Sequence, residues 1–147
     1  MFKHILVPTD GSPIANKAAK AGVRFARSIG ARVTGYYAIE LVRPQVYSEG
    51  YIPDEATMAA WDRRAKQYGD RHLASMARLA RAARVRFDSV CAKAPTPYEG
   101  IVATARKKKC DVIFMASHGR SGIAKLLVGS VTERVLATSK IPVVVYR

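Results

Sequence analysis

The residues with the clearest chemical pattern lie between Asp111 and Thr138. Residues 111–115 form a short apolar run typical of a buried parallel strand, and a polar loop containing Gly119 follows it. The loop ends at Ser130-Val131-Thr132-Glu133, which matches a capping box with Ser130 as the N-cap. Backbone amides at a helix start are unpaired and attract anions. The spacing therefore predicts a phosphate site between a strand end and a helix start.

Each of these residues also has a purely structural interpretation. Taken alone, Ser130 is more often only a helix cap, Gly119 a turn glycine and His118 a loop residue without chemistry. The sequence contains neither the GxxxxGK[ST] phosphate loop nor the GxGxxG dinucleotide pattern. The residues by themselves leave nucleotide binding and a plain strand-to-helix turn as open alternatives.

The glycine spacing resembles the signature of ATP-binding members of the universal stress protein family. That signature reads G-x-x-G, nine residues, then G-[ST]. Gly119, residues 120–128 and Gly129-Ser130 match it, while Ala116 replaces the first glycine, where its methyl group could crowd the sugar or phosphates. The opening ILVPTDGS and the closing IPVVVYR resemble the two ends of the family. The resemblance therefore covers essentially the whole chain.

The resemblance implies a set of nucleotide contacts for ATP, accompanied by Mg²⁺ or Mn²⁺ that the protein alone does not bind. Asp10 follows the first strand, where open α/β sheets place ligand contacts, although it could simply brace a turn. The adenosine is expected near Pro8, Thr9, Asp10 and Ile39. The phosphates are expected on Gly119, Arg120, Gly129, Ser130, Val131 and Thr132, with Met115, Ala116 and His118 completing the site.

Three classes of function remain open. The favoured class is an ATP-binding regulatory or stress-response protein that binds nucleotide without turning it over. The second is a nucleotide-dependent enzyme of the wider adenine-nucleotide-binding α/β group. Its usual SGGxDS and HxGH motifs are absent, and only His118 and Asp10 are candidates for an acid or base. The third class is a basic protein associated with nucleic acid.

The third class, a protein associated with nucleic acid, is suggested by the strongly basic composition of the chain. The chain has 25 Lys and Arg residues against 11 Asp and Glu, a formal net charge of +14. Much of the excess lies in residues 63–86 and in Lys107-Lys108-Lys109. A polyanionic partner is one interpretation. We favour the other, a solvated basic helix face, because no nucleic-acid-binding motif accompanies the charge.

Apolar runs and helix signals alternate along the chain that must position this site. We expect strands at 3–9, 31–39, 86–92, 111–115 and 141–147, and helix starts at Ser12, Asp54, Thr96 and Ser130. This alternation predicts one α/β three-layer sandwich with a five-stranded parallel sheet and helices on both faces. The resemblance implies the strand order 3-2-1-4-5, which would bring Asp10 opposite Gly119. The connection from 40 to 53 is a candidate lid.

Length and composition limit the class of protein. At 147 residues we expect one domain spanning 1–147, and the 49% hydrophobic content is ordinary for a globular protein. No apolar run reaches the ~18 residues of a membrane span, and no signal peptide is recognised, so we expect a cytoplasmic protein. Cys91 and Cys110 are isolated and are expected to be reduced core thiols.

The C-terminal strand from Ile141 to Val145 predicts a homodimer. It is apolar and strongly β-forming, and the implied order puts it at the sheet edge. An exposed apolar edge is a template for pairing with another chain. We expect two copies to pair these edges antiparallel about a two-fold axis, as the family resemblance also implies. The alternative is that the connection from 40 to 53 covers the edge within one chain.

Overall fold

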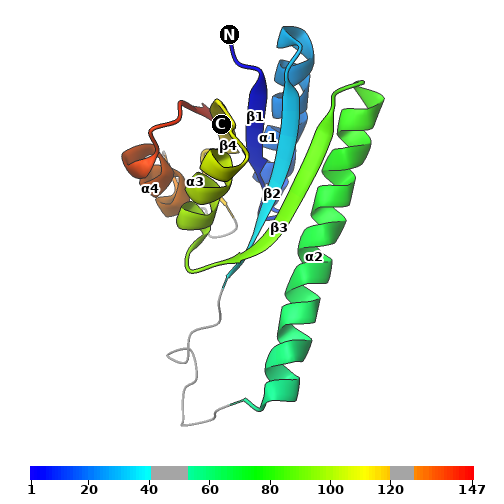
Figure 1. Cartoon of the computed structure of the whole chain (residues 1–147), viewed down its shortest axis with the longest axis vertical. Coiled ribbons are helices and arrows are strands. Elements are labelled where there is room, and N and C mark those ends of the chain that lie inside the picture. Colours follow the sequence, from blue (N-terminus) through cyan, green and yellow to red (C-terminus); the bar gives the residue numbers. More distant parts are fainter. Residues whose placement is uncertain (41–52, 120–127) are drawn as a thin grey trace.

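Strands and helices alternate along the chain in the computed structural model, which describes residues 1–40, 53–119 and 128–147 (Figure 1). The predicted alternation is confirmed. The elements are β1 (His4–Pro8), α1 (Pro13–Ile29), β2 (Arg32–Glu40), α2 (Glu55–Ala82), β3 (Phe87–Ala94), α3 (Pro97–Lys107), β4 (Val112–Ala116), α4 (Ser130–Thr138) and β5 (Val143–Tyr146).

The strands form one sheet in the order β3-β2-β1-β4-β5, and every neighbouring pair is parallel. The fold class and strand order that we expected are confirmed. The central strand β1 pairs with β2 from His4 to Pro8, and with β4 at Ile5 and Leu6. The strand order reverses between β1 and β4, so the ends of these two strands form the switch point of the sheet.

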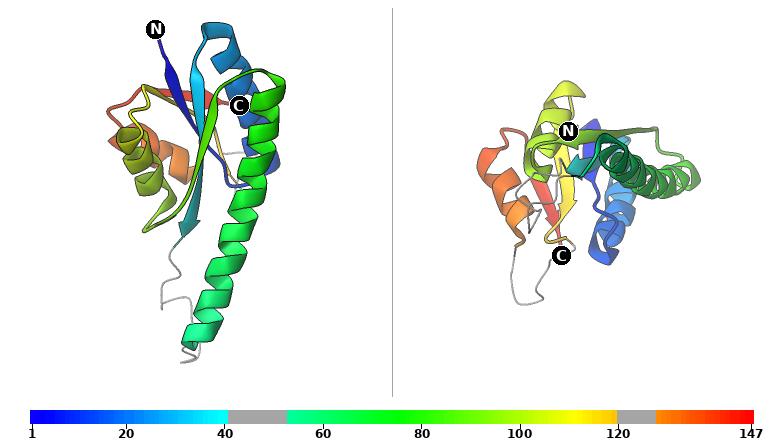
Figure 2. Two further views of the ribbon diagram at one scale, coloured as in Figure 1. Left: turned by 45° about the vertical axis from the view of Figure 1, so that its right-hand side comes forward. Right: turned by 90° about the horizontal axis from the view of Figure 1, so that it is seen from below.

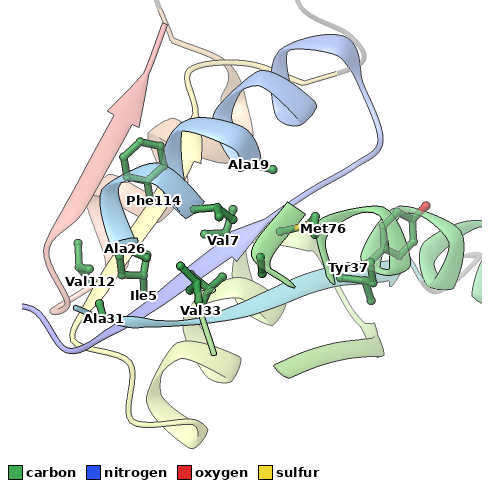
Figure 3. Close-up of a cluster of buried hydrophobic side chains, with 14 of the residues drawn as sticks. Ile5, Val7, Ala19, Ala26, Ala31, Val33, Tyr37, Met76, Val112 and Phe114 are labelled. Atoms are coloured by element: carbon green, nitrogen blue, oxygen red, sulfur yellow. The ribbon is translucent and has the colours of Figure 1, made fainter. Parts of the chain in front are cut away.

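Helices cover both faces of the sheet, with α1 and α2 on one face and α3 and α4 on the other (Figure 2). Alternate strand residues point to opposite faces. In β1, Ile5 and Val7 therefore join the core beneath α1 and α2, while Leu6 joins the core beneath α3 and α4. Figure 3 shows the first of these cores, in which Ala19 of α1 and Met76 of α2 pack on the sheet.

Two predicted helix starts are confirmed by their caps. At the start of α1, Ser12 Oγ accepts a hydrogen bond from Ala15 N at 3.3 Å, and Pro13 occupies the first helical turn. At the start of α2, Asp54 Oδ1 accepts one from Thr57 N at 2.7 Å. Both side chains satisfy amides that have no partner within the helix.

Strand ends differ from the sequence expectations by one or two residues. The third strand, expected at 86–92, runs to Ala94 because its pairing with β2 continues to Glu40. The last strand begins at Val143 rather than Ile141. Thr96 is the N-cap of α3 as predicted, but its hydroxyl donates to Glu99 Oε2 at 2.6 Å and caps no backbone amide.

The outer strand β5 pairs with β4 within the described part of the chain, and all four of its residues are half-buried. Most of the connection that we considered as a lid or edge cover, residues 41–52, lies outside the described residues. Within the ranges that the structure describes, no helix is both long and apolar enough to cross a bilayer. Cys110 is buried, which raises the pKa of its thiol to about 11, and Cys91 is half-buried.

Candidate functional site

A cleft of about 360 Å³ opens at the carboxyl ends of β1, β2 and β4, beside the first turn of α4. Open parallel sheets bind ligands at this edge, next to the switch point. The cleft therefore lies where the chain connectivity predicts a ligand. It is lined by Pro8, Thr9, Asp10, Ala15, Tyr36, Tyr37, Ala38, Glu40, Pro97, Ile101, Met115, Ala116, His118, Gly119, Gly129, Ser130, Val131 and Thr132.

The turn after β1 holds Asp10 at the cleft. Asp10 Oδ1 accepts a hydrogen bond from Ser12 N at 2.9 Å, and Thr9 Oγ1 accepts one from Gly11 N at 3.1 Å. Gly11 has φ +80°, and a Cβ atom there would collide with the His72 ring, so the position requires glycine. Asp10 thus braces its turn and lines the cleft, which makes the two interpretations of this residue compatible.

Gly119 brings the loop after β4 against Asp10, which confirms the expected juxtaposition. A Cβ atom added at Gly119 would lie 2.5 Å from Asp10 Oδ2. That is too close for any non-bonded contact of a carbon. A side chain at this position would therefore displace the Asp10 carboxylate, so glycine lets the two loops meet at the switch point with Asp10 in place.

The two ends of the glycine motif are tied together at Gly129. Gly129 N donates a hydrogen bond to Ser117 O at 2.6 Å. A Cβ atom at Gly129 would lie 3.0 Å from His118 Cα, so a larger residue would separate the start of α4 from the end of β4. Ser117 Oγ and His118 Nδ1 lie 3.0 Å apart and hydrogen bond to each other.

Helix α4 begins one residue earlier than we predicted. Gly129, not Ser130, is the N-cap: it has extended backbone angles, and its carbonyl oxygen accepts a hydrogen bond from Glu133 N at 2.9 Å. The predicted capping box is therefore wrong, because the N-cap residue is Gly129, which has no side chain to cap the helix. The amides of Ser130, Val131 and Thr132 form the first turn, have no partner within the helix, and belong to residues that line the cleft.

Thr132 fixes this helix to the end of β4. Its Oγ1 donates a buried hydrogen bond to Ala116 O at 2.9 Å. Ala116 itself is buried, ends β4 and lines the cleft. Ala116, the residue that departs from the family signature, thus lies next to the start of α4.

Ile39 does not line the cleft, contrary to the expectation for the end of β2. It is buried in the core beneath α1 and α2, whereas Tyr36, Ala38 and Glu40 line the cleft. Alternation along the strand puts Ile39 on the face opposite Ala38, but Tyr37, on the same face as Ile39, does line the cleft, so alternation alone does not decide the lining. Arg120 lies outside the described residues. The other predicted site residues all line the cleft.

Sequence reasoning missed several lining residues. Alternation from Ala38 would have found Tyr36 and Glu40. Pro97 and Ile101, one turn apart on α3, carry no local signal, because their role depends on which face of the sheet α3 covers. Burial raises the pKa of Tyr36, and a hydrogen bond with the Thr104 side chain partly opposes this. Its hydroxyl therefore remains protonated at neutral pH.

This parallel-sheet architecture, with a cleft and a helix start at the switch point, defines an α/β domain with a candidate ligand site. The chain belongs to the universal stress protein family, which it matches over residues 1–147. It is 31% identical over 147 residues to Universal stress protein MJ0531 of Methanocaldococcus jannaschii, covering 100% of this chain and 83% of that protein. A universal stress protein of Thermus aquaticus is 30% identical over 147 residues, with 100% of both chains covered.

Solved structures share the fold. Hypothetical protein MJ0577 superposes with a TM-score of 0.84 at 26% identity, over 99% of this chain and 95% of that one. A universal stress protein in complex with cAMP gives 0.71 at 21% identity, covering 99% and 97%. The universal stress protein from Archaeoglobus fulgidus in complex with dAMP gives 0.59 at 15% identity, covering 100% and 98%. At the last two identities the likeness shows the fold alone, and the nucleotides are those proteins' own ligands.

Proposed function

We propose that this protein is an ATP-binding universal stress protein with a regulatory or stress-response role, which binds nucleotide and does not turn it over. The observation that carries the proposal is the position of the start of α4, directly at the cleft. Its first-turn amides, from Ser130 to Thr132, meet a cleft at the switch point of a parallel sheet. Unpaired amides and the positive end of the helix dipole favour a phosphate group there.

The remaining lining suits an adenine nucleoside. Pro8, Ala38 and Ile101 supply apolar surface, and Asp10 supplies a carboxylate that can accept hydrogen bonds from a base or ribose. The nucleotides in two related folds, cAMP and dAMP, support an adenine ligand. Mg²⁺ or Mn²⁺ would accompany ATP mainly through its phosphate oxygens, as these ions usually bind.

Calorimetric titration with Mg-ATP and with AMP tests the proposal, together with mass spectrometry of nucleotide released from the purified protein. Ser130→Ala should weaken ATP severalfold because it removes an exposed hydroxyl beside the phosphate position. Gly129→Val should abolish binding, since its side chain would push α4 away from His118. Ser28→Ala, an exposed serine of α1, is the matched control. Unchanged ATP affinity in both cleft variants would falsify the site.

We further propose that hydrolysis is negligible. Asp10 and His118 are the titratable candidates that sequence analysis identified, and Asp10 Oδ1 is engaged in its own turn. A sustained multiple-turnover ATPase rate that His118→Ala abolishes would instead support the enzyme class. The expected outcome is release of phosphate at the rate of a no-protein control.

We also propose that the protein forms a homodimer through β5 and that it is located in the cytoplasm. An outer parallel strand with half-buried valines supports the dimer. Two free cysteines, Cys91 and Cys110, fit a reducing compartment, where disulfides are rare. Fractionation of cells that express the tagged protein would test its location.

A further inference from the structure

Positive charge is concentrated on the outer side of the α1–α2 layer. We call this surface the basic face. Residues 11–39 and 71–87 contain no Asp or Glu. The basic face consists of the exposed side chains Lys17, Lys20, Arg24 and Arg27 of α1, and Arg71, Arg78 and Arg81 of α2.

The basic residues of α1 form one stripe along the helix. Their spacings of three, four and three residues keep them on one side of a 3.6-residue helix. The buried residues of α1, including Ala15, Ala19 and Ala26, occupy the opposite side. The stripe therefore faces solvent directly away from the sheet, and no core contact explains it.

A second stripe runs beside the first. Arg71, Arg78 and Arg81 lie opposite the buried Leu73, Met76 and Ala80 of α2. The two helices cover the same face of the sheet and contact each other (Figure 2). Each stripe extends about 15 Å at 1.5 Å per residue, and packed helices lie about 8–10 Å apart. A groove lined by Asn16, Tyr68, Arg71, His72 and Ser75 lies between them.

No acidic residue of the described ranges forms an ion pair with the basic face. In the described ranges the ion pairs join Lys66 to Asp70, Lys93 to Asp62, and Lys108 to Asp88, and none includes a residue of the basic face. Like charges on one helix face repel each other and oppose folding. A solvated helix face needs no such concentration. An anionic partner would relieve the repulsion. This favours a binding surface over a basic helix face that is merely solvated.

The other side chains on and beside the basic face indicate which kind of polyanion it binds. A helix that binds a membrane surface inserts large apolar side chains. The exposed large hydrophobic residues of the described chain are Met1, Met58 and Leu136, and none lies on the basic face. Single-stranded nucleic acid needs aromatic rings for base stacking. Tyr68 is half-buried, with its ring against Tyr37 and His72. Phosphates of a duplex, contacted by Lys and Arg alone, fit this chemistry.

We propose that the basic face binds the phosphate backbone of double-stranded nucleic acid without reading its base sequence. A duplex carries one negative charge per about 1.7 Å of axis with both strands counted, so the about 15 Å of duplex beside a stripe carries about nine charges. Ala15 of α1 lines the nucleotide cleft, but within the described part of the chain no residue of the basic face does. Duplex binding is therefore separate from ATP binding and can be tested independently of it.

Fluorescence anisotropy with a labelled mixed-sequence duplex of about 25 base pairs tests the proposal. The protein should bind at about 50 mM KCl and lose roughly a hundredfold in affinity at about 200 mM, as about four phosphate contacts imply. A quadruple variant, Lys17→Gln, Lys20→Gln, Arg24→Gln and Arg27→Gln, should reduce affinity more than tenfold and flatten the salt dependence. These side chains are exposed, so circular dichroism should show an unchanged fold.

A charge-matched control separates the basic face from net charge alone. The substitutions Arg106→Gln, Lys107→Gln, Lys140→Gln and Arg147→Gln remove four exposed charges from other parts of the molecule. This control should bind the duplex nearly as the unmodified protein does, and both variants should keep their affinity for Mg-ATP. The proposal would be overturned if both variants lost duplex affinity equally, or if the unmodified protein did not bind duplex at low salt. Binding to phosphatidylserine vesicles but not to duplex would also overturn it. Triple replacement of Arg71, Arg78 and Arg81 by Gln should reproduce the loss.

Discussion

At the scale of single residues, small side chains decide how closely the backbone segments meet at the cleft. Gly119 and Gly129 were predicted from spacing as positions where a ligand approaches the backbone. The structure shows that each also lies in close contact with the protein itself, Gly119 with Asp10 and Gly129 with His118. Sequence alone could not reveal these contacts, because Gly119 and Asp10 lie on different loops, and His118 and Gly129 lie at opposite ends of the connection between β4 and α4.

Ala116 replaces the first glycine of the family signature, so its methyl group could restrict nucleotide binding. Replacing it by glycine, Ala116→Gly, should raise ATP affinity severalfold, because it removes a methyl group from the cleft lining beside Thr132. It should also lower the free energy of unfolding by about 0.5–1 kcal/mol, since glycine weakens a strand. Calorimetry and urea unfolding measure the two effects. Equal ATP affinity with and without the methyl group would show that Ala116 does not restrict the site.

His4 makes stability depend on pH at the opposite end of the sheet. It is 6% exposed, and its Nε2 lies 2.8 Å from Thr34 Oγ1. Burial, and secondarily the charge of Arg32, lower the pKa of His4, while Asp111 opposes the shift. The unfolded chain, with the ordinary histidine pKa of about 6.5, therefore takes up the proton first. The stabilisation is present above that value and is lost as pH falls towards the folded pKa.

His4→Gln tests this linkage because it keeps an amide for Thr34 and removes the titration. Between about pH 7.5 and 5.5, the unmodified protein should lose more stability than the variant. Urea unfolding at several pH values gives the comparison. Parallel pH profiles would exclude His4 as the titrating group.

At the scale of elements, sequence patterns predicted every strand and helix but not how α4 starts. The error at Ser130 arose because Ser-x-x-Glu is a good capping box, yet Gly129 already has the extended angles of an N-cap and accepts from Glu133. Ile39 lies in the core beneath α1 and α2, whereas Tyr36 and Tyr37, which point to opposite faces of β2, both line the cleft, so strand alternation does not by itself identify the cleft residues. Pro97 and Ile101 depend on the placement of α3, which no local pattern determines.

The attachment of α4 to β4 should control both stability and binding. Thr132→Val preserves shape but removes the buried hydrogen bond from Thr132 Oγ1 to Ala116 O. We expect a loss of about 1–2 kcal/mol in the free energy of unfolding, together with weaker ATP binding as the helix start becomes less well placed. Thr138→Val is the control on the same helix, since its hydroxyl donates to Arg134 O in an exposed position. It should change stability by less than about 0.5 kcal/mol. Equal effects from both substitutions would contradict this role.

At the scale of the whole molecule, the sheet order places an apolar strand at the edge, and we expect it to pair with a second copy. Val145→Lys introduces a charge on β5 at a residue outside both core clusters. Sedimentation equilibrium should show twice the 16.1 kDa chain mass for the unmodified protein and a single chain mass for the variant. Ser89→Lys, on the opposite edge strand β3, should remain dimeric. A monomeric unmodified protein at micromolar concentration, or a dimeric Val145→Lys, would rule out this interface.

The central position of β1 has a consequence for synthesis of the chain. One edge of β1 pairs with β2, which is the next strand in the sequence. The other edge pairs with β4, where Ile5 is opposite Val112. During translation the open side of β1 therefore remains unpaired until more than two thirds of the chain has been made. Such late, long-range pairing slows folding and leaves nascent chains prone to association. We expect chains truncated after β3 to aggregate or recruit chaperones, whereas the cleft forms only after α4 has left the ribosome.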